Sequence, residues 1–158
     1  MSSPNEPFQS LENLQAYQLA RQFRKRMYVV ARRLPDIEKF GLASQIRRAA
    51  VSLTNNIAEG HGRHHFLDQI RFLVQARGSL EELADDLNLC LDENYLPSPE
   101  IQDLKQMGAQ VQRVINGYGT YLKKRKAEGG STLQDSSVKY TAQGADRQAE
   151  DDLDESGF

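Results

Sequence analysis

Residues 43–63 read ASQIRRAAVSLTNNIAEGHGR, and this stretch combines a helical core pattern with an ordered polar face. Its apolar residues recur at intervals of three and four, which is the period of one face of an α-helix. These positions are Leu42, Ile46, Ala49, Ala50, Leu53 and Ile57. The polar stripe opposite them comprises Arg48, Ser52, Asn55 and Glu59. We expect a helix over about 42–59 that stops at Gly60, because glycine tolerates a left-handed turn.

Three further segments share the helical period and are separated by short connections. They span about residues 10–34, 66–93 and 98–126. The first ends before Pro35, because the residue preceding a proline avoids the helical conformation. Four helices joined by short loops favour an antiparallel up-down-up-down arrangement. The predicted fold class is therefore all-α, with a four-helix bundle at residues 10–126.

The two ends of the chain differ in composition from the predicted bundle. Residues 1–9 form an N-terminal extension that lacks the basic and apolar regions of a signal peptide. Residues 127–158 are rich in Gly, Ser, Gln and acidic residues, with few apolar side chains. Such a segment does not bury enough surface to offset its chain entropy. We therefore expect residues 127–158 to be an acidic, disordered tail.

The third predicted helix carries an apolar arc that is wider than one buried face requires. This width indicates burial against more than one neighbour, either within the bundle or in a second subunit. Gly78 lies in the middle of this helix. Glycine costs about 1 kcal/mol relative to alanine at such a position. A close approach of another helix would explain its presence.

The net charge of −2 hides an uneven distribution along the chain. Residues 1–126 hold 18 Lys and Arg against 14 Asp and Glu, a balance of +4, while residues 127–158 hold 2 against 8, a balance of −6. The first helix has six bases and no acid between Asn13 and Pro35. An ordinary solvated helix mixes the two signs. A face of one sign is typical of a surface that binds a polyanion.

The candidate nucleic-acid-binding residues lie on the first two helices and the turn that follows. They are Arg21, Arg24, Lys25, Arg26, Arg32, Arg33, Arg47, Arg48 and Arg63. Only Tyr17 and Tyr28 interleave with them, so contacts to phosphates should outweigh stacking on bases. An alternative is that these arginines pair with acids of the third helix on a neighbouring subunit. The acids in question are Glu81, Glu82, Asp85, Asp86, Asp92 and Glu93.

Several function classes lack the residues they need. The histidines at 61, 64 and 65 lie at a glycine-broken turn with no cysteine nearby, so we predict no metal and no cofactor. Cys90, the single cysteine, falls on the apolar arc and fits a reducing cytoplasm. No apolar run approaches the ~18 residues of a membrane span. We therefore expect a cytoplasmic, non-enzymatic protein with no membrane partner.

Several motifs resemble one known family. They are QIRRAAVSL at 45–53, NIAEG at 56–60, Arg63, FL at 72–73 and ARGSLEEL at 76–83. The chain resembles the four helix bundle protein family over about residues 8–122. Members are encoded by intervening sequences in bacterial 23S rRNA genes, and the accessory protein of diversity-generating retroelements is a distant relative. The resemblance implies an antiparallel four-helix bundle, a homopentamer, a nucleic-acid-binding role and no catalytic residues.

The residues that match the family motif are Arg48, Asn56, Glu59, Gly60 and Arg63. The sequence leaves open whether they build a ligand site or a joint between subunits. It also leaves a second functional hypothesis open. The bundle would then be a protein-interaction scaffold, or an accessory subunit for a nucleic-acid enzyme such as a reverse transcriptase. In that case it would contact nucleic acid only through its protein partner.

Overall fold

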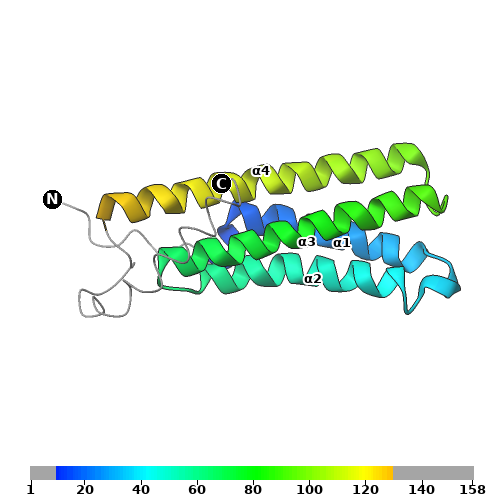
Figure 1. Cartoon of the computed structure of the whole chain (residues 1–158), viewed down its shortest axis with the longest axis horizontal. Helices are drawn as coiled ribbons and strands as arrows, with labels where there is room; N and C mark the ends of the chain where they lie inside the picture. Colours follow the sequence, from blue (N-terminus) through cyan, green and yellow to red (C-terminus); the bar gives the residue numbers. More distant parts are fainter. Residues whose placement is uncertain (1–9, 130–158) are drawn as a thin grey trace.

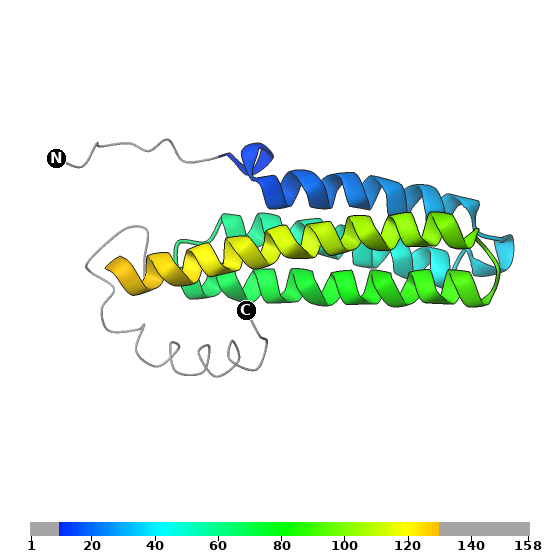
Figure 2. The same ribbon diagram turned by 90° about the horizontal axis from the view of Figure 1, so that it is seen from above.

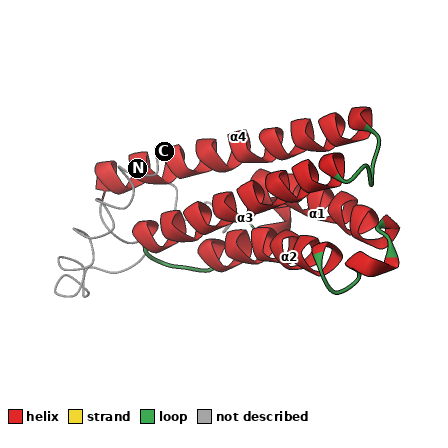
Figure 3. Ribbon diagram, turned by 45° about the vertical axis from the view of Figure 1, so that its right-hand side comes forward, coloured by secondary structure: helices red, strands yellow, loops and turns green. Residues whose placement is uncertain are grey.

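The computed structural model describes residues 10–129, and long helices dominate this part of the chain (Figures 1 and 3). The four α-helices are α1 (Gln15–Arg33), α2 (Leu42–His61), α3 (Phe66–Asp92) and α4 (Ser98–Gly129). Short 3₁₀ turns η1 (Leu11–Asn13) and η2 (Asp36–Glu38) precede α1 and α2. No strand occurs among the described residues. The predicted all-α four-helix bundle is confirmed.

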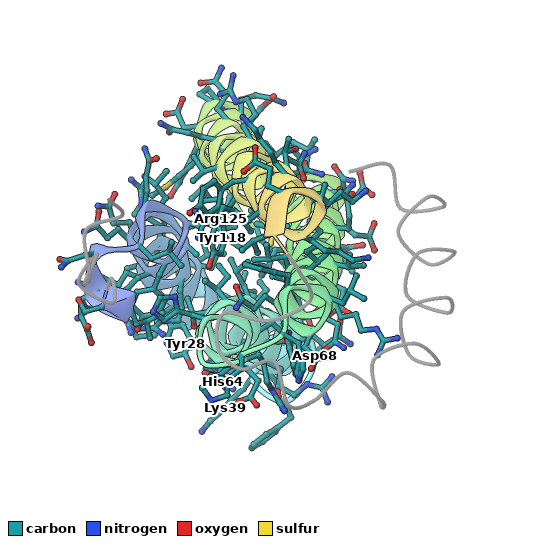
Figure 4. The ribbon with its side chains drawn as sticks, turned by 90° about the vertical axis from the view of Figure 1, so that its left-hand side faces the viewer. Tyr28, Lys39, His64, Asp68, Tyr118 and Arg125 are labelled. Carbon is teal, nitrogen blue, oxygen red and sulfur yellow. The ribbon has the colours of Figure 1, made fainter. Side chains whose placement is uncertain are left out.

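The helices form a closed square in which each packs against two neighbours, α1 on α2, α2 on α3, α3 on α4 and α4 on α1 (Figure 4). Contacts between the helices show the direction in which each helix runs. Ser52 bonds to Ser79 and Gly60 lies against Phe72, so residue numbers rise along α2 as they fall along α3. The colours in Figure 2 trace the same reversal from each helix to the next.

The core lies along the bundle axis and is built from all four helices. Its largest fully buried side chains are Phe23, Met27, Ile46, Leu53, Ile57, Ile70, Leu73, Leu83, Leu87, Ile101, Leu104 and Ile115. The wide apolar arc of α3 is covered by α2 on one side and α4 on the other. The bundle itself therefore accounts for the width of this arc, without a second subunit.

One prediction about a glycine was wrong, and a second is not met within this chain. Gly60 does not end α2, which continues to His61, and the capping residue Gly62 has a right-handed φ of −78°. A Cβ on Gly60 would lie 2.9 Å from Cβ of Phe72 and 3.1 Å from the carbonyl oxygen of Gln69. Gly60 is thus the residue that allows α2 and α3 to approach closely. No other helix of this chain approaches Gly78 closely, since a Cβ there would meet nothing within 4 Å.

The first helix begins later than expected, since α1 starts at Gln15 and residues 11–13 form the separate 3₁₀ turn η1, whereas the other helix ends differ little from the expected ones. α3 stops at Asp92, followed by Asn94 in a left-handed conformation (φ 56°), which asparagine tolerates better than most residues. α4 continues to Gly129, past the expected end at residue 126, and Lys124 and Glu128 form an i,i+4 ion pair there at 3.8 Å. The predictions for residues 1–9 and 130–158 lie outside the described residues. None of the described helices is both long and apolar enough to cross a bilayer.

Candidate nucleic-acid interface

The helices α1 and α2 carry eight of the nine candidate bases, and their outer sides are almost free of acids. Between Gln15 and Arg33 the sequence contains no Asp or Glu, and between Leu42 and His61 it contains only Glu59. The core positions of both helices take up the apolar residues, so the bases are left on the remaining sides. The structure divides the nine candidate residues among three places.

The largest group lies on the outer sides of α1 and α2, and we call it the α1–α2 face. It consists of Arg21, Arg24, Lys25, Arg32 and Arg47, with Arg48 flanking it on the outer side of α2. Arg24 Nη1 donates to Thr54 Oγ1 at 2.8 Å, which fixes the arginine at the joint between the two helices. Arg47 Nη2 donates to the Lys39 carbonyl oxygen at 3.3 Å.

The other members of the α1–α2 face point to solvent. Arg21, Lys25 and Arg32 are exposed and follow one another at helical spacings of four and seven. Arg48 is exposed as well. Among residues 10–129, none of these four side chains has a hydrogen bond or ion pair in the structure. Their charges are therefore available to an external anion.

Two tyrosines share the stripe of α1 that carries these bases. Tyr17, Arg21, Arg24, Tyr28 and Arg32 follow at intervals of four, three, four and four. Both rings are half-buried and pack against the hydrophobic core, and Figure 4 shows Tyr28 on the side of α1 that faces α2. Half-buried rings leave only part of their surface to solvent. The geometry favours phosphate contacts over base stacking at this surface.

A second group lies on the opposite side of α1, against α4. Arg33 donates from both terminal nitrogens to the Glu100 carboxylate, with one contact, Nη2 to Oε2, at 3.1 Å. This hydrogen bonding lowers the pKa of Glu100 and raises the pKa of Arg33. The charge of Arg26 adds a smaller lowering of the Glu100 pKa. Arg26 and Arg33 are thus apart from the α1–α2 face, and Glu100 pairs with Arg33.

The third location is the end of α2, where Arg63 lies. Its Nη2 atom contacts Glu59 Oε1 at 2.6 Å, and its guanidinium carbon lies 5.0 Å from the centroid of the Phe72 ring. The two charged side chains are 46% and 54% exposed, so the pair stays open to solvent. Arg63 packs over α3 through this cation–π contact. It is engaged within the chain, unlike the exposed bases of the α1–α2 face.

Among the remaining family-motif residues, Gly60 and Arg63 contact α3, whereas Asn56 bonds within α2. Asn56 Nδ2 donates to the Ser52 carbonyl oxygen at 2.9 Å and to Ser52 Oγ at 3.1 Å. Ser79 Oγ donates to Ser52 Oγ at 2.9 Å. Gly60, Arg63 and the Ser52–Ser79 bond thus form a helix–helix joint inside one chain. Asn56 supports Ser52 from within α2, Glu59 holds Arg63, and Arg48 takes no part.

Thr54, Phe72 and Ser79 belong to these joints and were absent from the predicted site residues. Thr54 and Ser79 are polar residues on otherwise buried positions, with 1% and 5% exposure. A buried hydroxyl needs a hydrogen-bond partner. A polar residue on a core-facing stripe is therefore the sequence signal that would have identified Thr54 and Ser79.

The turn between α2 and α3 forms a surface hollow of about 430 Å³, lined in part by Arg63, His64, His65 and Asp68. In the described part of the chain, no three His, Cys, Asp or Glu side chains are grouped as metal ligands would be. Cys90 lies in the core, where burial raises its pKa to about 11. A thiol with so high a pKa is a poor nucleophile at neutral pH.

The acids of α3 are mostly exposed, with one exception. Asp86 is only 8% exposed. Burial, and then the nearby charges of Asp85 and Glu82, raise its pKa to about 6. It is seven residues from Ser79, so it occupies the same side of α3, toward α2. The outer acids of α3 include Glu82, Asp85 and Asp92, and the exposed Glu93 follows directly after the helix.

These features define a class: a four-helix-bundle protein with one basic face and a tightly joined α2–α3 pair. Within that class, the chain belongs to the 23S rRNA-intervening sequence protein family, whose model matches residues 12–117. The family resemblance inferred from the motifs is confirmed. The search of curated proteins finds no match.

A solved structure supports the fold. The chain is similar to the crystal structure of a protein of unknown function from the S23 ribosomal protein family of Bacteroides thetaiotaomicron VPI-5482. The two chains share 19% sequence identity, the match covers 66% of this chain and 95% of the other, and the TM-score is 0.62. At this identity the similarity bears on the fold alone.

Proposed function

We propose that this protein is a non-enzymatic, self-assembling bundle that binds RNA or DNA through its α1–α2 face. The observation that carries the proposal is the lack of neutralising acids on these two helices. Their sole carboxylate, Glu59, is engaged by Arg63 at the far end of α2. Arg21, Lys25, Arg32 and Arg48 remain exposed beside the anchored Arg24 and Arg47.

Binding at this face would be driven by counterion release from the phosphate backbone, because guanidinium and ammonium groups replace condensed cations. The two half-buried tyrosines supply little stacking surface, so the preference for any sequence should be weak. One copy presents only a few free charges and would bind weakly. We further propose the homopentamer that the family resemblance implies, since five repeated faces would raise the affinity through avidity.

A salt titration tests the proposal. Binding of fluorescently labelled duplex and single-stranded RNA and DNA would be followed by anisotropy between ~50 and 200 mM salt. We expect the affinity to fall steeply as the salt concentration rises. The double charge reversal Arg21→Glu with Lys25→Glu should reduce the slope of log affinity against log salt concentration by about two. Arg113→Glu reverses an exposed charge on α4 and is the matched control. Failure of the wild-type protein to bind any of these probes at low salt would contradict the proposal.

A second candidate function is supported by the acidic outer side of α3. Glu82, Asp85 and Asp92 are exposed there, with Glu93 directly after the helix, and would complement the α1–α2 face of another molecule. The bases would then hold a protein assembly, or a nucleic-acid enzyme to which this chain is an accessory. In that case the double reversal of Arg21 and Lys25 breaks the protein complex, and the wild-type protein has no salt-dependent affinity for nucleic acid.

A further inference from the structure

The connection between α1 and α2 exposes two large apolar side chains at one end of the bundle. Ile37 is 86% exposed and Phe40 is 89% exposed, and we call this pair the apolar tip. Scattered apolar residues are normal on protein surfaces, but nearly complete exposure of two large ones side by side is typical of a contact surface.

The backbone of the apolar tip is held firmly although its side chains are free. Glu38 lies between the two exposed residues and is bonded on both carboxylate oxygens. Its Oε1 accepts from the Tyr95 hydroxyl at 3.0 Å, and its Oε2 accepts from the backbone N–H of Leu42 at 3.0 Å. The Gly41 N–H also donates to the Glu38 carbonyl oxygen at 3.1 Å. The tip is therefore a preorganised projection, which lowers the entropic cost of docking it.

A recess that suits such a projection lies between α3 and α4. Its floor and walls are largely apolar, with a volume of about 250 Å³. The lining residues that matter here are Phe23, Leu80, Ala84, Leu87, Gly108 and Ala109. Gly108 lies directly over the buried ring of Phe23, since a Cβ there would lie 3.3 Å from Cζ of Phe23. Drug-sized ligands occupy pockets of roughly 300–1,000 Å³, so this recess is better suited to one aromatic side chain.

The tip cannot fill the recess of its own chain. Lys39, between the two tip residues, lies beside α2 and points away from the bundle, whereas the recess opens between α3 and α4 on the other side (Figure 4). Only a second copy can bring the two surfaces together. A contact between different surfaces of identical chains is heterologous, and it closes into a ring when the rotation between copies permits.

Charges around the two surfaces are complementary. Lys39 Nζ lies 5.5 Å from the centroid of the Phe40 ring, so a cation accompanies the aromatic side chain. Glu81 and Lys105 both line the recess, and the Lys105 ammonium bonds to Asn88 Oδ1. The neighbouring α3 residues Glu82 and Asp85 are exposed, so acids outnumber bases at this surface. A docked Phe40 would place the Lys39 ammonium near these carboxylates. This pairing favours the recess of a second copy over an uncharged apolar partner.

We propose that the apolar tip of one copy docks into the α3–α4 recess of the next, with Phe40 inserted against Gly108 and Phe23. The inference rests on the self-assembly in the proposed function and names the surfaces that join the copies. It leaves the exposed bases of the α1–α2 face outside the joint. Assembly and nucleic-acid binding would then use separate residues.

Light scattering on size-exclusion fractions tests this joint. Phe40→Ser removes the inserted ring, and Ala109→Trp covers the mouth of the recess from an exposed helical position. We expect each variant to raise the concentration for half-assembly by roughly tenfold or more, as for an interface anchor. Val29→Ser and Ala127→Trp are matched changes at other exposed positions and should assemble like the wild type. Circular dichroism of each variant verifies that the helices are intact.

Mixing the two variants distinguishes a heterologous joint from other contacts. Phe40→Ser retains an intact recess and Ala109→Trp retains an intact tip, so an equimolar mixture should form discrete heterodimers that neither variant forms alone. A Phe40→Ser or Ala109→Trp protein that assembles like the wild type would overturn this inference. A wild-type chain that stays monomeric would instead contradict the assembly part of the proposed function, whereas nucleic-acid binding is measured separately.

Discussion

The α2–α3 pair and the α1–α4 pair are joined by different means. Between α2 and α3 the contacts are short-range: Gly60 lies against the backbone of α3, and Ser52 bonds directly to Ser79. Between α1 and α4 the contacts come from long side chains, with Arg33 reaching Glu100 and the Phe23 ring lying over Gly108. The α2–α3 joint therefore depends on small residues, and the α1–α4 joint depends on long side chains.

The close contacts of the α2–α3 joint leave no room for added atoms, whereas the Arg33–Glu100 pair of the α1–α4 joint is partly exposed to solvent. We therefore expect substitutions in the α2–α3 joint to affect stability strongly and those in the α1–α4 joint to affect it weakly. The following predictions test this contrast, from the largest expected effect to the smallest.

Gly60→Val should cause the largest loss of stability. Its Cβ would lie 2.9 Å from Cβ of Phe72 and 3.1 Å from a backbone carbonyl oxygen, so the two helices must separate. We expect the free energy of unfolding to fall by about 3 kcal/mol, near the upper end of overpacking costs. Urea denaturation monitored by circular dichroism measures this change.

Gly78→Ala is the matched control for Gly60, because it adds a methyl group to a helical glycine in open space. We expect a gain of about 1 kcal/mol from helix propensity. Equal effects of the two substitutions would show that the close approach of α2 and α3 has no energetic importance.

Asp86→Asn should stabilise the protein, with a strength that depends on pH. The pKa of Asp86 is raised from 3.8 to about 6 in the folded state, so the folded chain binds more protons than the unfolded chain between these values. Wild-type stability should thus decrease as the pH rises from 4 to 6. We expect Asp86→Asn to gain up to about 3 kcal/mol at pH 8 and little at pH 4.

The causes of the raised Asp86 pKa can be separated with Asp85→Asn. Asp85 is exposed, and its charge is a smaller cause than burial. Its neutralisation should therefore give a smaller gain at pH 8 in the same direction. A wild-type stability that is constant between pH 4 and 8 would contradict the role assigned to Asp86.

Most of the fold was predictable because each helix shows its core as a repeat of apolar residues. The same pattern could not distinguish the roles of Gly60 and Gly78. Both lie within helices, and only the position of the neighbouring helix decides which one allows a close approach. The nine basic residues were likewise identifiable by type, but the partners of Arg24 and Arg33 are 30 and 67 residues away in sequence. Spacing along a helix carries no information about such distant pairings.

Ser79→Ala should have an intermediate effect on the α2–α3 joint. It removes the hydrogen bond to Ser52 Oγ, but Ser52 still accepts a bond from Asn56. We expect a loss of about 1 kcal/mol, the usual net value of one intramolecular hydrogen bond. A double-mutant cycle with Ser52→Ala measures the coupling, and a coupling near zero would show that this bond does not join the helices.

Glu100→Gln should have the smallest effect, because its ion pair with Arg33 is exposed at 46% and 27% of the two side chains. The pKa of Glu100 is lowered in the folded state, so its contribution is present above the unfolded pKa and is lost as the pH falls through the folded pKa. We expect the melting temperature to decrease by no more than about 2 °C at pH 7 and not at all at pH 2. Asp103→Asn, an exposed carboxylate of α4, is the control. A decrease in melting temperature at pH 7 as large as that caused by Gly60→Val would show that the α1–α4 joint contributes as much stability as the α2–α3 joint.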